Sequence, residues 1–378
     1  MLTLLKSCEL YSPEKEEICD ILLGGNRILA IGKELFPQKG LITEIVNCSG
    51  YKVFPGLIDP LCFPCGDGND HGREMLFQPT LFADSAKLAG VSSLIGTLGW
   101  NDITRSPDTL LRKTKELCGK QIKVYTYTGG FRGNSAVMTG SIASDLTYIA
   151  EIKATGAIGI ADHRSGLLSE DIVSTTHAEA EAGAELGEKS AVVVYLLGEE
   201  KQHYTSQLNI LNKMTPVFRH TMLAGVNRNS EALEAGKKFG MKGLVNIAAN
   251  TSGFFQDDAI EAKTALKEYL RAGVPIKNII ISSYAGIEAV KPQSTNLETQ
   301  YGMFYSAFCE SISDINIPTD VVAKVFSSNA SKIFRLNDAG IIKEGMDADI
   351  LVSTNDFKPV HLFIRGTQVL QDRKVVEE

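Results

Sequence analysis

The sequence has few of the features that mark membrane, secreted or nucleic-acid-binding proteins. Its longest apolar runs, such as residues 191–197, have the length of a strand and are far too short to cross a bilayer. Residues 1–20 are rich in charge and contain no secretory apolar segment, so we expect a cytoplasmic protein with no membrane association. The formal charge of -7 is spread along the chain without basic blocks, which argues against nucleic acid as a partner.

Cysteine and histidine are also scarce. The seven cysteines are odd in number and irregular in spacing, which favours reduced thiols over a disulfide framework. The six histidines include no pair at His-x-His spacing and none four residues apart. Because two zinc ions need a dense set of histidines and carboxylates, the sequence offers little material for a binuclear centre.

The chain does have enough hydrophobic residues for a large core. Of its 378 residues, 44% are hydrophobic and 22% are charged, which is typical of a globular protein. Apolar, β-rich runs alternate with helical stretches, including a solvated helix over residues 169–187, and this alternation indicates a parallel sheet. Candidate strands lie near residues 53–58, 92–98, 123–128, 157–161, 191–197, 222–226, 244–248 and 279–283. Eight such units predict a (β/α)₈ barrel, in which the functional residues lie at the C-terminal ends of the strands.

The two ends of the chain have the pattern of a small all-β unit. Residues 21–23 and 28–31 are short apolar runs separated by Gly-Gly-Asn, which is a hairpin signal. Residues 340–372 show similar short strands. We therefore expect an α/β protein with a barrel over residues 53–339 and a small β-sandwich domain made from residues 1–52 and 340–378.

Residues 53–70, VFPGLIDPLCFPCGDGND, resemble the first barrel strand of metal-dependent amidohydrolases. Further strings, in order, resemble the isoaspartyl (β-aspartyl) dipeptidases of that superfamily: GWNDITRSPDTLLRKTKEL (99–117), YTGGF (127–131), MTGSI (138–142), GIADHRS (159–165), GVNRN (225–229) and ISS (281–283). The resemblance extends over about residues 45–370. It implies a TIM-type barrel of the amidohydrolase kind, a flanking β-sandwich, and assembly into a homo-oligomer.

The resemblance also implies where metal ligands would be found. The similar enzymes hold two zinc ions with a His-x-His pair, a carbamylated lysine, two further histidines and a catalytic aspartate. The matching positions here are occupied by Leu61, Phe63, Ala157, Leu196, Gly225 and Tyr284. None of these is a usual zinc ligand. We therefore expect no binuclear metal centre and no cofactor, with an apolar plug in the space that the metals would take.

Substrate-binding residues of the family have clearer counterparts. The resemblance assigns the arginines of DHRS and VNRN, Arg164 and Arg228, to the carboxylates of a dipeptide, and a guanidinium suits that task because it binds a carboxylate through two hydrogen bonds. An acid that binds the substrate amine falls near Asp70, and a carbonyl-polarising tyrosine falls at Phe131, which has no hydroxyl. The expected ligand is a small amino-acid or dipeptide-like carboxylate. Ion pairs within loops are the alternative role of both arginines.

Three functions are compatible with these residues. The first is a non-hydrolytic pseudoenzyme that binds such a carboxylate or acts as a structural subunit with a protein partner. The second is a metal-independent enzyme in which Arg164 and Arg228 hold the substrate and Tyr284, Asp70 or a cysteine transfers a proton. For Tyr284, a packed aromatic that fills the vacated metal cavity is the favoured role. The third is a residual hydrolase with one zinc displaced to Cys62, Cys65 and His71. A redox pair and, more commonly, buried inert thiols are the alternatives for the two cysteines.

Overall fold

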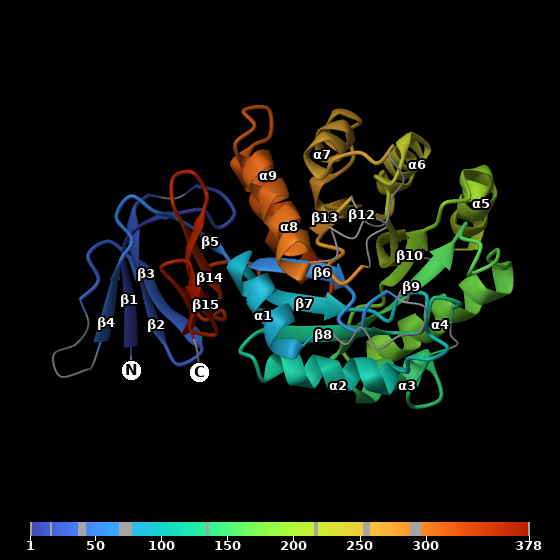
Figure 1. Cartoon of the computed structure of the whole chain (residues 1–378), viewed down its shortest axis with the longest axis horizontal. Coiled ribbons are helices and arrows are strands. Elements are labelled where there is room, and N and C mark those ends of the chain that lie inside the picture. The colour runs from blue at the N-terminus through green and yellow to red at the C-terminus, as the bar shows by residue number, and fades with distance from the viewer. Residues whose placement is uncertain are drawn as a thin grey trace.

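The computed structural model describes residues 2–15, 17–36, 43–67, 78–133, 136–214, 218–251, 258–287 and 296–376. Two β-sheets organise this part of the chain, and helices surround one of them (Figure 1). Within these ranges no helix combines the length and apolar character needed to pass through a membrane.

Eight parallel strands form the first sheet. They are β6 (Leu57–Cys62), β7 (Val91–Gly96), β8 (Lys123–Thr128), β9 (Ile152–Ile160), β10 (Val193–Leu197), β11 (Thr221–Ala224), β12 (Leu244–Ala248) and β13 (Ile279–Ser282). Neighbours in the sheet follow the order of the sequence, and every pair is parallel. The predicted (β/α)₈ barrel is therefore confirmed.

The boundaries of two strands differ from the prediction by more than two residues. The run 53–58 spans two strands, because β5 (Lys52–Pro55) pairs in the second sheet and the barrel strand β6 begins only after Gly56. A Cβ on Gly56 would lie 2.6 Å from the Cβ of Ser92, so only glycine fits where the chain passes from one sheet to the other. The fourth barrel strand, β9, begins at Ile152 rather than at residue 157.

Helices cover the outside of the barrel (Figure 1). They are α1 (Pro79–Leu88), α2 (Pro107–Cys118), α3 (Ile142–Tyr148), α4 (Glu170–Leu186), α5 (Tyr204–Met214), α6 (Ser230–Gly240), α7 (Ala262–Arg271), α8 (Leu297–Ile312), α9 (Thr319–Ala323) and α10 (Asn329–Ile333). The predicted helix 169–187 is confirmed as α4, where the Ser169 side chain accepts a hydrogen bond from the backbone N–H of Ile172. This N-cap satisfies a backbone donor that the helix itself leaves unpaired.

The second sheet joins the two ends of the chain, and we call it the sheet domain. Its strands are β1 (Leu2–Leu10), β2 (Cys19–Gly24), β3 (Arg27–Gly32), β4 (Thr43–Asn47), β5, β14 (Ile350–Ser353), β15 (Pro359–Ile364), β16 (Thr367–Gln371) and β17 (Lys374–Val375). The predicted hairpin is confirmed as β2 and β3. N-terminal β5 pairs antiparallel with C-terminal β14, so both chain ends lie in this domain (Figure 1).

The barrel closes between its first and last strands, and we call this contact the seam. The backbone N–H of Tyr284 donates to the carbonyl of Leu61 at 3.1 Å, and that of Phe63 donates to the carbonyl of Ala285 at 2.7 Å. Both bonds lie at the C-terminal ends of β6 and β13. They therefore fix the end of the barrel, called the mouth below, at which this fold places functional residues.

A buried carboxylate completes the seam. Asp59 of β6 accepts hydrogen bonds from the backbone N–H of Ser283 at 2.8 Å, from the Ser283 hydroxyl at 2.5 Å and from the Tyr301 hydroxyl at 3.3 Å. Burial raises the pKa of the Asp59 carboxyl to about 6, and these donors oppose the rise. Asp59 thus joins β6 to the end of β13 and to helix α8.

Candidate functional site

The mouth brings together the positions at which the resemblance implies metal ligands. Leu61 lies in β6, Ala157 in β9 and Leu196 in β10. Phe63 and Gly225 directly follow β6 and β11, and Tyr284 lies two residues beyond β13. All of them except Gly225 belong to one buried hydrophobic cluster in the barrel interior. Gly225 adjoins the cluster, because a Cβ on it would lie 3.4 Å from Cδ1 of Leu196.

Aromatic packing fills the centre of this group. Phe63 and Tyr284 are at most 1% exposed, and their ring centroids lie 6.5 Å apart at a tilt of 55°. The Tyr284 hydroxyl accepts a hydrogen bond of 2.8 Å from the backbone N–H of Gly225. Leu61 is also completely buried. The side chains that the sequence predicted to form an apolar plug therefore do pack together.

These residues do not fit a binuclear zinc centre. The side chains of Leu61, Phe63 and Leu196 have no lone pair with which to bind a cation. Burial raises the pKa of Tyr284, so its phenol stays protonated, and its oxygen already accepts the Gly225 N–H. The side chains of the plug therefore do not provide the ligands that a catalytic metal would need.

Arg164 follows β9 and is held by a carboxylate of its own loop. Its Nε and Nη2 donate to the two carboxylate oxygens of Asp162 at 2.9 and 2.7 Å. The guanidinium carbon lies 5.1 Å from the ring centre of Trp100 and 6.0 Å from that of Phe131. Burial alone would raise the pKa of Asp162, but its hydrogen bonds with Arg164 outweigh burial and lower it. Arg164 thus forms the loop ion pair that the sequence left as its alternative role.

Arg228 follows β11 and is only 7% exposed. Its Nη1 donates to the backbone carbonyl of Leu197 at the end of β10. Burial lowers the pKa of Arg228, and the nearby charge of Arg164 adds to the lowering. The positive charges of the two arginines therefore influence each other at the mouth, and Arg228 is the more deeply buried of the two.

The other predicted site residues are less informative. The ring of Phe131 packs over Gly159, where a Cβ would lie 2.3 Å from Cζ of the ring. Its side chain has no polar group that could polarise a carbonyl. Asp70 and His71 lie outside the described residues.

The two cysteines proposed for a displaced zinc lie in different hydrophobic clusters. Cys62 belongs to the layer between the barrel strands and the helices, whereas Cys65 packs with Leu98 and Leu110. Burial raises the pKa of both thiols, that of Cys65 to about 11. Since zinc binds thiolates, these environments oppose metal binding.

A group of polar residues at the mouth was not recognised as a unit in the sequence. Potential ligand atoms of Asp162, His163 and Glu199 all lie within 4.8 Å of one another. Asp162 is already engaged by Arg164, and His163 Nδ1 contacts Glu199. Glu199 lies two residues beyond β10, and that position at a strand end was its only sequence signal.

Comparison with known proteins gives fold-level matches. No family model matches the sequence. The structure is similar to that of β-aspartyl dipeptidase from Fervidobacterium islandicum AW-1 in complex with a β-Asp-Leu dipeptide, with a TM-score of 0.86 and 23% identity over 100% of this chain and 99% of the other. It is also similar to dihydropyrimidinase from Brevibacillus agri NCHU1002, with a TM-score of 0.72 and 13% identity over 100% and 96% of the two chains.

In sequence, the chain is 24% identical to a dihydroorotase from Lactiplantibacillus plantarum over 237 residues, or 63% of this chain. The match spans only 50% of that relative's length. Together with the closed parallel barrel and the sheet domain, these similarities show that the chain has the fold of the amidohydrolase superfamily, in the form found in β-aspartyl dipeptidase.

Proposed function

We propose that this protein is a non-hydrolytic relative of the β-aspartyl dipeptidases that binds a small amino-acid or dipeptide-like carboxylate at the mouth of its barrel. The observation that carries the proposal is the contrast between two groups at the mouth. Hydrophobic packing around Phe63 and Tyr284 occupies the strand ends where catalytic metals would be bound, while Arg228 is kept as a buried cation beside it.

Arg228 is the residue that we expect to anchor the ligand. Its Nη1 donates to the Leu197 carbonyl at the end of β10, which places the guanidinium at the mouth, and a carboxylate suits a guanidinium because it accepts two parallel hydrogen bonds. The dipeptide in the Fervidobacterium islandicum enzyme is an example of such a ligand class. Arg164 would form a second contact only after Asp162 releases its guanidinium, so its part is secondary.

The alternatives have weaker support. A metal-independent reaction through Tyr284 would need the proton of a phenol that is completely buried and hydrogen-bonded to Gly225. A residual hydrolase with one displaced zinc would need thiolates at Cys62 and Cys65, which burial disfavours. A structural role in a homo-oligomer or with another protein is compatible with ligand binding, and light scattering would measure the size of the assembly.

A thermal-shift screen of amino acids and β-aspartyl dipeptides, with and without chelator, tests the proposal directly. We expect carboxylate ligands to raise the melting temperature without being hydrolysed. Replacing Arg228 by Ala should abolish the shift, with a loss of roughly 2–5 kcal/mol of binding free energy, and Arg228→Lys should weaken binding because an ammonium cannot form the paired bonds. The exposed Arg271 on α7 provides a control, since Arg271→Ala should leave the shift intact.

Other outcomes would favour the alternatives. Hydrolysis that depends on one bound metal ion would favour the displaced zinc site, and turnover in the presence of chelator would favour the metal-independent enzyme. The absence of any shift at millimolar ligand would overturn ligand binding at the mouth and leave the structural role.

A further inference from the structure

A cavity of about 570 Å³ lies at the opposite end of the barrel, where the N-terminal ends of β8 and β9 meet the sheet domain. Its wall includes Lys123 and Tyr125 of β8 and Lys153 of β9, together with Arg365 at the turn between β15 and β16. The cavity is thus formed by both parts of the fold and is remote from Arg228 at the mouth.

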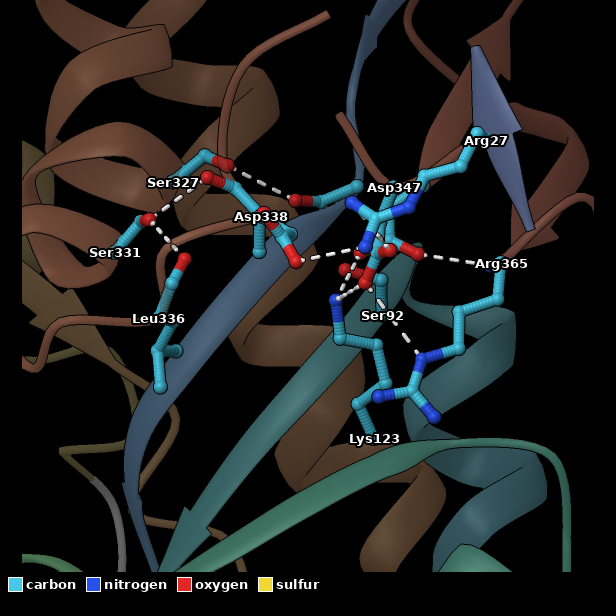
Figure 2. A network of polar contacts seen from close by, with 12 residues as sticks. Arg27, Ser92, Lys123, Ser327, Ser331, Leu336, Asp338, Asp347 and Arg365 are labelled. Carbon is cyan, nitrogen blue, oxygen red and sulfur yellow. Dashed lines mark hydrogen bonds and ion pairs between the residues drawn. The ribbon is translucent and has the colours of Figure 1, made fainter. Parts of the chain in front are cut away.

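Two buried carboxylates, Asp347 and Asp349, bind cationic side chains of the barrel and of the sheet domain beside this cavity (Figure 2). The Lys123 ammonium donates to Asp347 at 2.9 Å and to Asp349 at 2.6 Å. Arg27 lies 3.3 Å from the second oxygen of Asp347. The second oxygen of Asp349 accepts the backbone N–H of Arg365 at 2.9 Å, and Nε of Arg365 lies 3.6 Å from Asp347. Every oxygen of the two carboxylates therefore already has a partner.

This arrangement leaves cationic groups facing the cavity. The terminal nitrogens of Arg365 have no partner among the described residues, and its side chain is 53% exposed (Figure 2). The Lys153 ammonium lies 5.0 Å from the ring centre of Tyr125 and forms no ion pair with a described residue. Burial lowers the pKa of Lys153 because it disfavours the charged ammonium. An anion bound beside Lys153 would stabilise the charged form. Glu151, the acid that lines the cavity, lies 3.8 Å from Lys115 and acts on Lys153 from farther away.

We propose that this cavity binds the phosphate group of a small molecule between Arg365 and Lys153. A phosphate carries close to two negative charges and presents oxygens in several directions, which suits cations that approach from different elements. A planar carboxylate suits a single guanidinium better. Asn26, Gln121 and Thr367 supply further polar groups, and the Tyr125 ring offers a flat wall to the rest of the molecule. A bound phosphate would bridge the barrel and the sheet domain.

Calorimetric titration of the whole chain with inorganic phosphate, in a phosphate-free buffer, tests this site. We expect saturable binding that becomes weaker by roughly tenfold or more in Arg365→Gln and in Lys153→Gln, because each variant removes one charged hydrogen-bond donor. Lys277→Gln is the matched control, since Lys277 is an exposed lysine at the same end of the barrel, and it should bind phosphate like the wild type.

Two further results decide the proposal. Arg228→Ala should retain phosphate binding, which separates this site from the carboxylate site proposed at the mouth. Succinate should compete only weakly. Absence of saturable binding at millimolar phosphate, equal binding by the two cavity variants and the wild type, or tighter binding of succinate than of phosphate would each overturn the assignment.

Discussion

At the scale of single residues, Tyr284 connects the seam to the plug. Its backbone has a φ of 54°, a left-handed conformation that is uncommon for a bulky residue, and its N–H donates to Leu61 across the seam. That conformation accompanies a completely buried ring against Phe63 and a hydroxyl bonded to Gly225. One side chain thus ties together the ends of β6, β11 and β13.

Replacing Tyr284 by Phe should lower the free energy of unfolding by about 1–3 kcal/mol, because the buried N–H of Gly225 would lose its acceptor. Urea denaturation measures the effect. Tyr148→Phe, at an exposed position on α3, should change nothing. Equal stabilities of Tyr284→Phe and the wild type would show that the hydroxyl bond contributes no stability.

The stabilising effect of protonated Asp59 should decrease as the pH rises. Burial places its folded-state pKa at about 6, above the value in an unfolded chain, so the folded protein holds this proton more tightly. The contribution is fully present below about pH 4 and is lost as the pH passes about 6, a change of about 3 kcal/mol. The test is to measure the free energy of unfolding of the wild type and of Asp59→Asn at several pH values between about 4 and 6. The wild type should lose stability relative to the variant, whereas a constant difference would contradict the expectation.

At the scale of elements, apolar patterning predicted the barrel because parallel strands buried on both faces appear as continuous apolar runs. The same property misplaced a boundary, since residues on both sides of Gly56 are apolar although β5 and β6 belong to different sheets. The sequence did not predict which side chains the site residues would contact. The pairing of Arg164 with Asp162 depends on the loop conformation, and the contact between His163 and Glu199 joins residues from two separate loops.

The N-cap of α4 offers a test at this scale. Ser169→Ala removes the oxygen that accepts the Ile172 N–H and should lower the free energy of unfolding by about 1 kcal/mol. Ser174→Ala, at an exposed position within the same helix, should be neutral or slightly stabilising because alanine favours helix. Thermal denaturation of both variants would distinguish capping from the general effect of removing a serine hydroxyl.

At the scale of the whole molecule, buried charges connect the barrel to the sheet domain. Lys123 belongs to a barrel strand, whereas Asp347 and Asp349 lie at the start of the C-terminal part of the sheet domain, and all three are buried. The two parts are therefore joined by a buried ion network.

Lys123→Met should destabilise the protein by about 3–5 kcal/mol, because it leaves two buried carboxylates without their shared cation. Lys277→Met at the same end of the barrel is exposed and should have little effect. Chemical denaturation followed by circular dichroism measures both. Similar stabilities of the two variants would mean that water or the nearby arginines replace Lys123.

The pairing of β5 with β14 has a consequence for synthesis of the chain. The ribosome completes β5 near residue 55, but β14 begins only at Ile350. At about 5–20 residues per second, one edge of β5 stays without its partner for roughly 15–60 s. During this interval the nascent chain exposes an open strand edge, which is a template for aggregation. A chain that stops before residue 350 keeps that edge open permanently, so truncated products should be insoluble even where the barrel strands are complete.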